Sequence, residues 1–265
     1  MLLEQINFYY SIAGFLVGAL VGFTGVGGGS LMTPLLVLLF NFHPATAVGT
    51  DLLYASITKT AGSAVHGWRS TVDWKIVRRL ATGSVPAAIL TLLALQHIGA
   101  PSDVAAKLIT TILGVMLLLT SVAIMFQARI VAFATEKLGT AFSDERPIPT
   151  HILGVILGVL VSISSIGAGA LGVTALLILY PKLPVARIVG SDIAHAVPLT
   201  LVAGIGHWYL GNVDGHLLIS LLIGSIPGII IGSYFGSGSS DRKLRPVLAA
   251  VLLLVGSMSL YKVLS

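Results

Sequence analysis

Ionisable side chains stand inside long apolar stretches of this chain. An ionised group is costly to hold in an apolar medium, so such residues usually face a protein interior or a watery path and are candidates for function. A cation at that depth suits an anion, and an imidazole titrates close to neutral pH. We predict that one of these residues, Lys59, contacts a bound anion. We predict proton coupling or gating for the other five, which are Asp51, His66, Asp192, His195 and His207.

Structural roles for the same residues stay open. Lys59 could extend to the membrane surface or pair with a carboxylate for packing alone. Asp51 and Asp192 could form hydrogen bonds within the first turns of their helices. If the two halves of the chain have opposite orientations, Asp51 is expected to pair with His207, and Asp192 with His66.

Two segments rich in glycine and serine interrupt the apolar runs, "GFTGVGGGS" at 22–30 and "SSIGAGA" at 164–170. Consecutive glycines adopt dihedral angles closed to other residues and let another atom approach the main chain. The helix that follows each break presents free N–H groups and the positive end of its dipole, which together attract an anion. We predict substrate contacts at Thr24, Gly25, Gly27, Gly28, Gly29, Ser30, Ser164, Ser165, Gly167, Ala168 and Gly169.

Other glycines have a plainer explanation. Small residues at every fourth position, as in Gly14, Gly18 and Gly22, or in Gly224, Gly228, Gly232 and Gly236, are typical of helix packing faces. A soluble dinucleotide-binding loop is disfavoured, because Ser30 stands where the third glycine of that motif belongs and no βαβ pattern surrounds it.

The composition excludes a soluble globular domain. Of the 265 residues, 55% are hydrophobic and 9% are charged, with a mean hydropathy of +0.99. Recurrent apolar runs predict an all-α polytopic membrane protein. The lack of cysteine excludes disulfides, thiol catalysis and cysteine metal sites. We predict no metal, no cofactor, no enzymatic activity and no nucleic-acid partner; the expected partners are a small anionic substrate and the lipid bilayer, and a homodimer stays open.

The chain is an internal duplication. Pro44 returns as Pro184 with an offset of 140, and Asp51 returns as Asp192 with an offset of 141. Each half carries five apolar segments, at 8–22, 28–41, 45–67, 74–97 and 103–127, then at 150–164, 168–181, 185–210, 215–236 and 244–264. The first two of each half are short, which predicts two inverted-topology repeats, each with a re-entrant or short-helix hairpin and three transmembrane helices. The expected divisions are a first repeat at 1–128, a cytoplasmic linker at 129–149 and a second repeat at 150–265.

Basic residues orient this arrangement. With the hairpins entering and leaving on one side, twelve Lys and Arg residues fall on one face, Lys107 and Lys262 fall on the other, and Lys59 lies within the membrane. An excess of Lys and Arg marks cytoplasmic loops. Both termini are therefore expected outside the cytoplasm.

The first half resembles the TauE/SafE family of permeases, also called sulfite exporters. The resemblance rests on "GFLVGALVGFTGVGGGSLMTPLL" and "HPATAVGTDLLYASITKTAGSAVHGWRSTVDW". It implies a transporter in a bacterial or archaeal cell membrane, often an exporter, for small sulfur-containing or carboxylate anions such as sulfite, sulfonates or sulfoacetate-like compounds. The second half departs from the pattern, since Ala168 replaces a glycine and His195 stands opposite Tyr54.

The predicted function is a secondary transporter with alternating access, because the chain contains no nucleotide-binding loop. Discontinuous helices that meet near the membrane midplane mark the substrate site in many such transporters. An anion channel is the nearest alternative. An intramembrane serine hydrolase is disfavoured, because Ser30 is followed by Leu31 and the serines of "SSIGAGA" precede its glycines.

Overall fold

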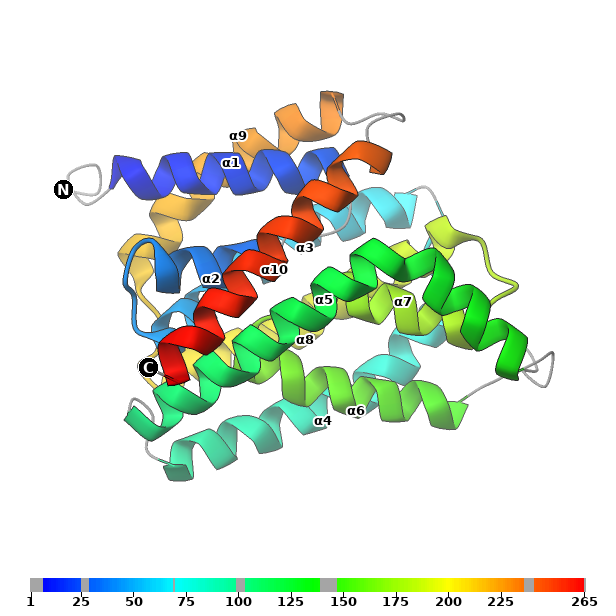
Figure 1. The fold of residues 1–265 in the computed structure, drawn as a ribbon, viewed down its shortest axis with the longest axis horizontal. Helices are drawn as coiled ribbons and strands as arrows, with labels where there is room; N and C mark the ends of the chain where they lie inside the picture. The colour runs from blue at the N-terminus through cyan, green and yellow to red at the C-terminus, as the bar shows by residue number, and fades with distance from the viewer. Residues whose placement is uncertain are drawn as a thin grey trace.

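The computed structural model describes residues 7–24, 29–68, 70–98, 103–138, 147–235 and 241–264. These residues form helices and no strand, which confirms the predicted all-α fold (Figure 1). In chain order the helices are α1 (Phe8–Thr24), α2 (Gly29–Leu38), α3 (Pro44–Trp68), α4 (Trp74–Ile98), α5 (Asp103–Leu138), α6 (Pro147–Ser164), α7 (Ala170–Leu179), α8 (Val185–Tyr209), α9 (Gly215–Phe235) and α10 (Asp241–Leu264).

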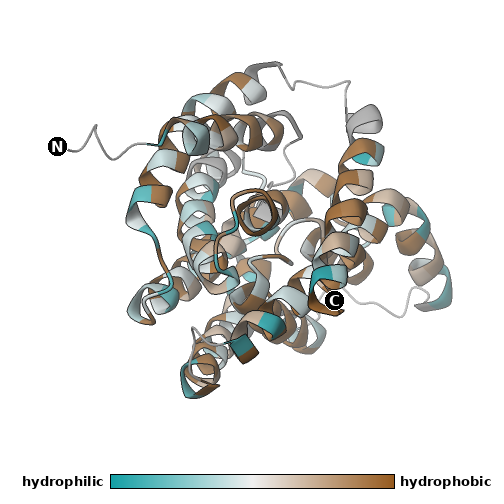
Figure 2. Cartoon of the chain, turned by 60° about the vertical axis from the view of Figure 1, so that its left-hand side comes forward, coloured by the Kyte–Doolittle hydropathy of each residue, from teal (hydrophilic) through white to brown (hydrophobic). Residues whose placement is uncertain are grey.

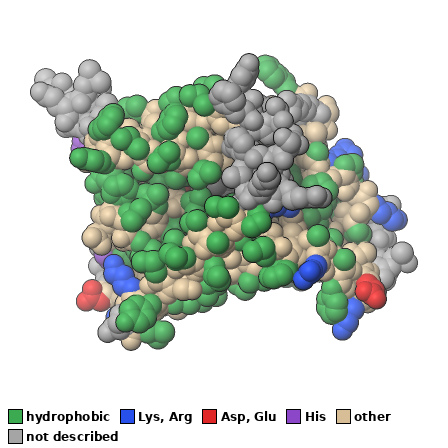
Figure 3. Space-filling model, turned by 45° about the horizontal axis from the view of Figure 1, so that its top comes forward, with side chains coloured by type: hydrophobic (Ala, Val, Ile, Leu, Met, Phe, Trp, Pro, Cys, Tyr) green, Lys and Arg blue, Asp and Glu red, His purple; other side chains and the backbone are tan. Residues whose placement is uncertain are grey.

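The surface is that of a multi-pass membrane protein. Among the described residues, six helices are long and apolar enough to cross a membrane: α4, α5, α6, α8, α9 and α10. Apolar residues run along the helices and hydrophilic residues form only short patches (Figure 2). Hydrophobic side chains cover the middle of the face in Figure 3, and charged side chains lie toward its ends, as expected for a bilayer-spanning surface.

The helices differ in length from the segments expected. Helices α1 and α6 have 17 and 18 residues, whereas α2 and α7 have 10 each. At a rise of 1.5 Å per residue, the longer pair extends about 26 Å and the shorter pair about 15 Å. Each hairpin therefore combines a nearly spanning helix with a half-length one. Helix α6 is longer than its apolar run because it begins at Pro147, and proline suits the first helical position.

Helix α5 continues well past residue 127, where the apolar segment was expected to end, and stops at Leu138. The segment 129–138 therefore forms a helical extension, although it lies in the range expected to be a linker. Its sequence, "RIVAFATEKL", contains good helix formers and carries charges that water can solvate.

The two ends of the molecule differ in charge. The start of α1 lies at the left end in Figure 1, together with the start of α5 and the end of α10; the last two helix ends carry Lys107 and Lys262, which line one pocket. The right end collects the starts of α4, α8 and α10 and the end of α5. Basic residues on those helix ends are Lys75, Arg187, Arg245 and Lys137.

Contacts between the halves are reciprocal. Helix α1 packs on α9, and the equivalent helix α6 packs on α4. At these contacts glycines lie against the main chain of the other half, and each contact has its equivalent under the repeat. The pairs are Gly14 with Leu221 and Gly154 with Leu80, then Gly18 with Ser225 and Gly158 with Ser84. The packing role predicted for Gly14 and Gly18 is therefore confirmed, as is that of Gly224, Gly228 and Gly232.

Equivalent helices run antiparallel where they meet. Helix α5 packs on α10, and α3 packs on α8. The contacts that fix these directions are Gly114 with Leu260, Ser121 with Ala249, Gly49 with His207 and Gly204 with Leu53. A rotation that exchanges the two halves therefore reverses the direction of these helices.

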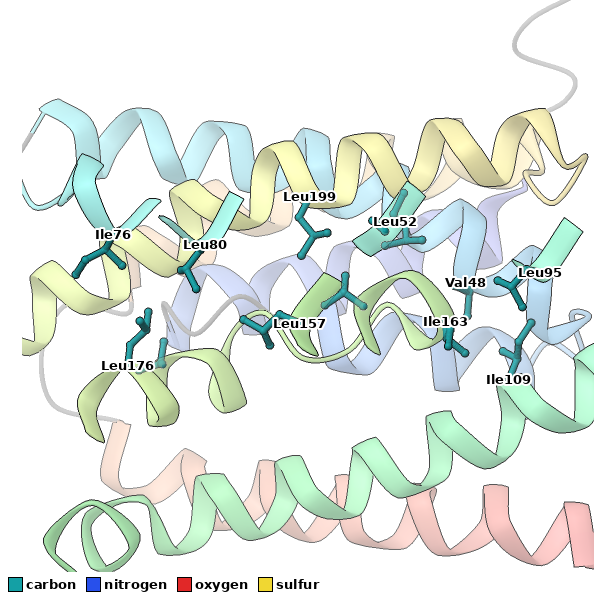
Figure 4. Packing of buried hydrophobic residues seen from close by; sticks show 14 of the residues in the cluster. Val48, Leu52, Ile76, Leu80, Leu95, Ile109, Leu157, Ile163, Leu176 and Leu199 are labelled. Atoms are coloured by element: carbon teal, nitrogen blue, oxygen red, sulfur yellow. The ribbon is translucent and has the colours of Figure 1, made fainter. Parts of the chain in front are cut away.

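Buried apolar side chains anchor the half-length helices. Leu176 of α7 belongs to a cluster with Leu80 and Leu157 that Figure 4 shows from close by. Met32 and Leu36 of α2 belong to a second cluster. Close packing of this kind holds backbone segments in place, and α3 and α8 contribute residues to the same clusters as α2 and α7.

Candidate functional site

The break between α6 and α7 contains three residues with left-handed dihedrals. The φ angles are 59° at Ser165, 138° at Gly167 and 129° at Gly169. Glycine adopts such angles without a steric penalty, which explains two of the three positions. The Ser165 N–H closes α6 by donating to Val161 O at 2.7 Å. The chain therefore leaves α6 in a tight loop and enters α7 with its first amides pointing back toward that loop.

The preceding loop accepts hydrogen bonds from only part of the first turn of α7. Gly172 N–H donates to Gly167 O at 2.9 Å, and Val173 N–H donates to Gly169 O at 2.7 Å. Helix geometry leaves the earlier N–H groups of α7 without an acceptor inside the helix, at the positive end of its dipole. The Cα of Gly167 faces the side chains of Leu157 and Val161, so that side of the loop packs on the apolar core.

Asp192 of α8 lies over this first turn. Its side chain is fully buried, and Oδ1 occupies the space that a Cβ of Gly172 would fill. The Gly169 N–H faces the same carboxylate. Oδ1 has no hydrogen-bond partner. A carboxylate of the protein itself therefore stands at the positive end of α7.

Asp51 of α3 holds the equivalent place beside α2. Thr33 Oγ1 donates to Asp51 Oδ2 at 2.5 Å, and the Thr33 N–H faces the carboxylate. From the other half, the Ser165 hydroxyl faces Asp51 without reaching hydrogen-bond geometry. Asp51 Oδ1 lacks a hydrogen-bond partner, as Asp192 Oδ1 does.

Lys59 is buried near both carboxylates. Its side chain is 9% exposed, and Nζ donates to Ala168 O in the α6–α7 loop at 3.5 Å. The ammonium group interacts electrostatically with both Asp192 and Asp51, more strongly with Asp192. A side chain that reaches the loop of the other half does not snorkel to the membrane surface, so that alternative is wrong. In the second half, Thr200 stands at the position equivalent to Lys59, and its hydroxyl donates to a carbonyl within its own helix.

A second pair of equivalent residues, Tyr54 and His195, lies about one helical turn beyond Asp51 and Asp192. His195 Nε2 lies 2.8 Å from Ser84 Oγ of α4, and the equivalent Tyr54 faces Ser225 of α9 without reaching hydrogen-bond geometry. Both His195 Nδ1 and Tyr54 OH are buried without a partner. The sequence analysis missed Ser84, Ser225 and Thr33, although the offset of 141 relates the two serines.

His207 does not pair with Asp51. Its Nε2 lies 2.9 Å from Ser162 O, and its Nδ1 lies 3.4 Å from Asn212 Nδ2. Nε2 therefore donates a hydrogen bond to the carbonyl, and Nδ1 accepts one from the amide. This is the pattern of a neutral imidazole. The expected Asp51–His207 pair is wrong, because the acid is bonded within its own half and the histidine is bonded near the end of α8.

Part of the predicted site falls outside the described residues. Gly25, Gly27 and Gly28 lie there entirely. Thr24, Gly29 and Ser30 belong to α1 and α2, and His66 belongs to α3, but their side chains are also outside the described part. Of the second loop, Ser164 bonds back to Leu160 O at 2.7 Å, whereas Ser165, Ala168 and Gly169 approach the three charged residues.

Known proteins resemble this chain over most of its length. Residues 10–258 match the family model described as Sulfite exporter TauE/SafE. A protein of Bacillus subtilis named probable membrane transporter protein YjnA is 40% identical over 250 residues, which cover 92% of this chain and 96% of that protein.

More distant relatives carry similar names. Probable membrane transporter protein YdhB of Bacillus subtilis is 30% identical, with 91% of this chain and 97% of that protein covered. Probable membrane transporter protein MJ0441 of Methanocaldococcus jannaschii is 25% identical, with 92% of each covered. No solved structure matches the chain significantly. The extent of the family match, together with the apolar helices, shows that the chain belongs to the TauE/SafE family of membrane transporters.

Proposed function

We propose that this protein is a secondary transporter of a small sulfur-containing or carboxylate anion, and that it works as an exporter in the cell membrane. The observation that carries the proposal is the buried Lys59 ammonium group at the α6–α7 loop. A cation beside the free amides of a helix N-terminus is a favourable place for an anion of one or two charges. Glycines and serines at the same break let an oxyanion approach the main chain.

The reciprocal contacts support an inverted repeat and alternating access. Helices α5 and α10, which are equivalent, run antiparallel, as do α3 and α8. Two halves of this kind exchange their conformations when access switches from one side of the membrane to the other. The end with more Lys and Arg is assigned to the cytoplasm, which places both termini outside.

The class of substrate follows from the names of the family and from the donors at the break. The family description names a sulfite exporter. N–H groups and hydroxyls with one ammonium group suit sulfite, a sulfonate or a carboxylate equally, because all three present two or three oxygens to short hydrogen-bond donors. The direction of transport and its coupling to a gradient belong to the same proposal.

Thermal unfolding of the purified protein tests anion binding. Unfolding can be followed by far-UV circular dichroism, because the described residues are mostly helical. An anion at about 100 times its Kd stabilises the folded state by about 2.7 kcal/mol. We expect sulfite, thiosulfate, a sulfonate or acetate to raise the melting temperature of the wild type. The shift should be lost in Lys59→Met and kept in Lys75→Met, which changes an exposed lysine.

Transport separates a carrier from a channel. In proteoliposomes, we expect uptake of the stabilising anion to saturate and to accelerate when the same anion is loaded on the opposite side. Uptake that rises linearly with concentration and shows no such exchange would identify a channel. If no anion of the panel shifts the melting curve, the anion assignment is wrong.

A further inference from the structure

The two equivalent carboxylates have different partners. Asp51 accepts a hydrogen bond from the Thr33 hydroxyl. At the position equivalent to Thr33 the second half has Val173, which offers no hydroxyl. Asp192 faces the Gly169 N–H and the Lys59 charge instead. One carboxylate therefore has a neutral donor as its hydrogen-bond partner, and the other faces the N-terminus of α7 and the charge of Lys59.

Asp192 stands where an external anion would bind. Its Oδ1 lies against Gly172, the third residue of α7, and a side chain on Gly172 would collide with it. The carboxylate is buried, and Oδ1 has no hydrogen-bond partner. The positive end of α7 and the Lys59 ammonium group thus already have an anion beside them, supplied by the chain itself.

A second anion at this place would leave the charges unbalanced. Asp51, Asp192 and Lys59 carry a net charge of −1 when all are ionised. A bound anion adds at least one more negative charge in a buried region, where unpaired charge costs several kcal/mol. A proton on the Asp192 carboxylate removes that excess and also releases the carboxylate from the helix end.

The other charged groups around Asp192 do not replace this proton. On α8 itself, His195 is bonded to Ser84 through Nε2, and its Nδ1 is buried without a partner, where an added positive charge is costly. Before α4, Asp73 lies near Ser191, but its Oδ1 accepts from the first N–H groups of α4. Helix α7 contains no ionisable residue, and the only one in α6, His151, is bonded to Thr82. The basic residues of α4, namely Lys75, Arg78, Arg79 and His97, are exposed or half-buried.

We propose that the Asp192 carboxylate and the substrate anion compete for the same place at the α7 N-terminus, so that each anion binds together with one proton. The proton comes from water and forms the Asp192 carboxylic acid, while the anion takes the contacts with Lys59 and the α7 amides. Asp51 stays bonded to Thr33 throughout and takes up no proton. The inference rests on the proposed function and adds its coupling ion.

Two measurements on the full-length protein test the competition. The probes are thiosulfate, methanesulfonate and acetate, which stay ionised from roughly pH 6 to pH 8. In a weakly buffered solution, at a pH where Asp192 is ionised without the anion, we expect the wild type to take up one proton for each anion bound. Over the pH range in which Asp192 is ionised without the anion and protonated with it, the apparent affinity should rise by up to about tenfold for each unit of falling pH, because proton binding and anion binding are linked.

The variants assign the proton to one residue. Asp192→Asn should bind the anion with an affinity that no longer depends on pH and should take up no proton. Asp51→Asn should keep the pH dependence of the wild type. Thermal melting without anion, followed by circular dichroism, shows whether each variant folds, and the proton count on the wild type needs no variant.

The outcomes separate the two proposals. Anion binding without proton uptake, or a pH dependence that survives in Asp192→Asn, overturns the competition and leaves the anion site intact. A pH dependence that is lost in Asp51→Asn but kept in Asp192→Asn would place the proton on Asp51 and would also overturn the proposed competition. If none of the three probes binds to the wild type or to Asp192→Asn, the proposed function fails as well.

Discussion

Removing the Lys59 charge should destabilise the protein, and removing Asp192 as well should restore part of the loss. Lys59→Met leaves two buried carboxylates with no cation between them. Unit charges about 8 Å apart, beyond direct ion-pair contact, interact by about 2 kcal/mol at an effective dielectric constant of about 20. We therefore expect a coupling free energy of about 2 kcal/mol between Lys59 and Asp192.

The same cycle with Asp51 is the matched control. Lys59 interacts more strongly with Asp192 than with Asp51, and Asp51 has the Thr33 hydroxyl as a partner. The coupling between Lys59 and Asp51 should therefore be the smaller of the two. Each cycle needs two single variants and one double variant, with asparagine replacing the aspartate and methionine replacing the lysine.

Melting of the six proteins in one detergent, followed by circular dichroism, gives the coupling. For a chain of this size, 1 kcal/mol corresponds to a shift of about 2 to 4 °C. Lys59→Met should therefore melt several degrees below the wild type, and its combination with Asp192→Asn should recover several degrees. Additive effects in the Asp192 cycle, or a larger coupling with Asp51, would refute the assignment of Lys59 to the α7 end.

Two further predictions concern the framework of the site. Gly158→Ala places a Cβ against the Ser84 backbone, so we expect a loss of about 1 to 3 kcal/mol from overpacking and a lower melting temperature, whereas Gly215→Ala meets open space and should melt like the wild type. Thr33→Val removes the donor to Asp51 at 2.5 Å and should cost about 1.5 to 3 kcal/mol, as expected for a hydrogen bond to a charged group; an unchanged melting curve would show that Asp51 is not held by Thr33.

The internal repeat predicted contacts between helices better than the apolar segments predicted the ends of the helices. Offsets of 140 and 141 aligned glycines that turn out to make reciprocal contacts, Gly14 with Leu221 and Gly154 with Leu80. A glycine that packs on a backbone tolerates no side chain, so its spacing is preserved in both copies. Helix ends followed hydropathy less well, because helices continue past an apolar run wherever the residues favour them, as at Pro147 and Leu138.

The sequence by itself determined the all-α membrane class, the duplication, and the list of ionisable residues in apolar surroundings. Each of these is a matter of composition or spacing along one chain, which needs no knowledge of neighbours. Only the tertiary structure decided that Asp192 lies over the first turn of α7, that Lys59 reaches the loop of the other half, and that His207 bonds to Ser162 instead of an acid. Hydrogen-bond partners on different helices depend on how the two halves pack against each other, because the rotation of each helix decides which polar atoms come within hydrogen-bond distance.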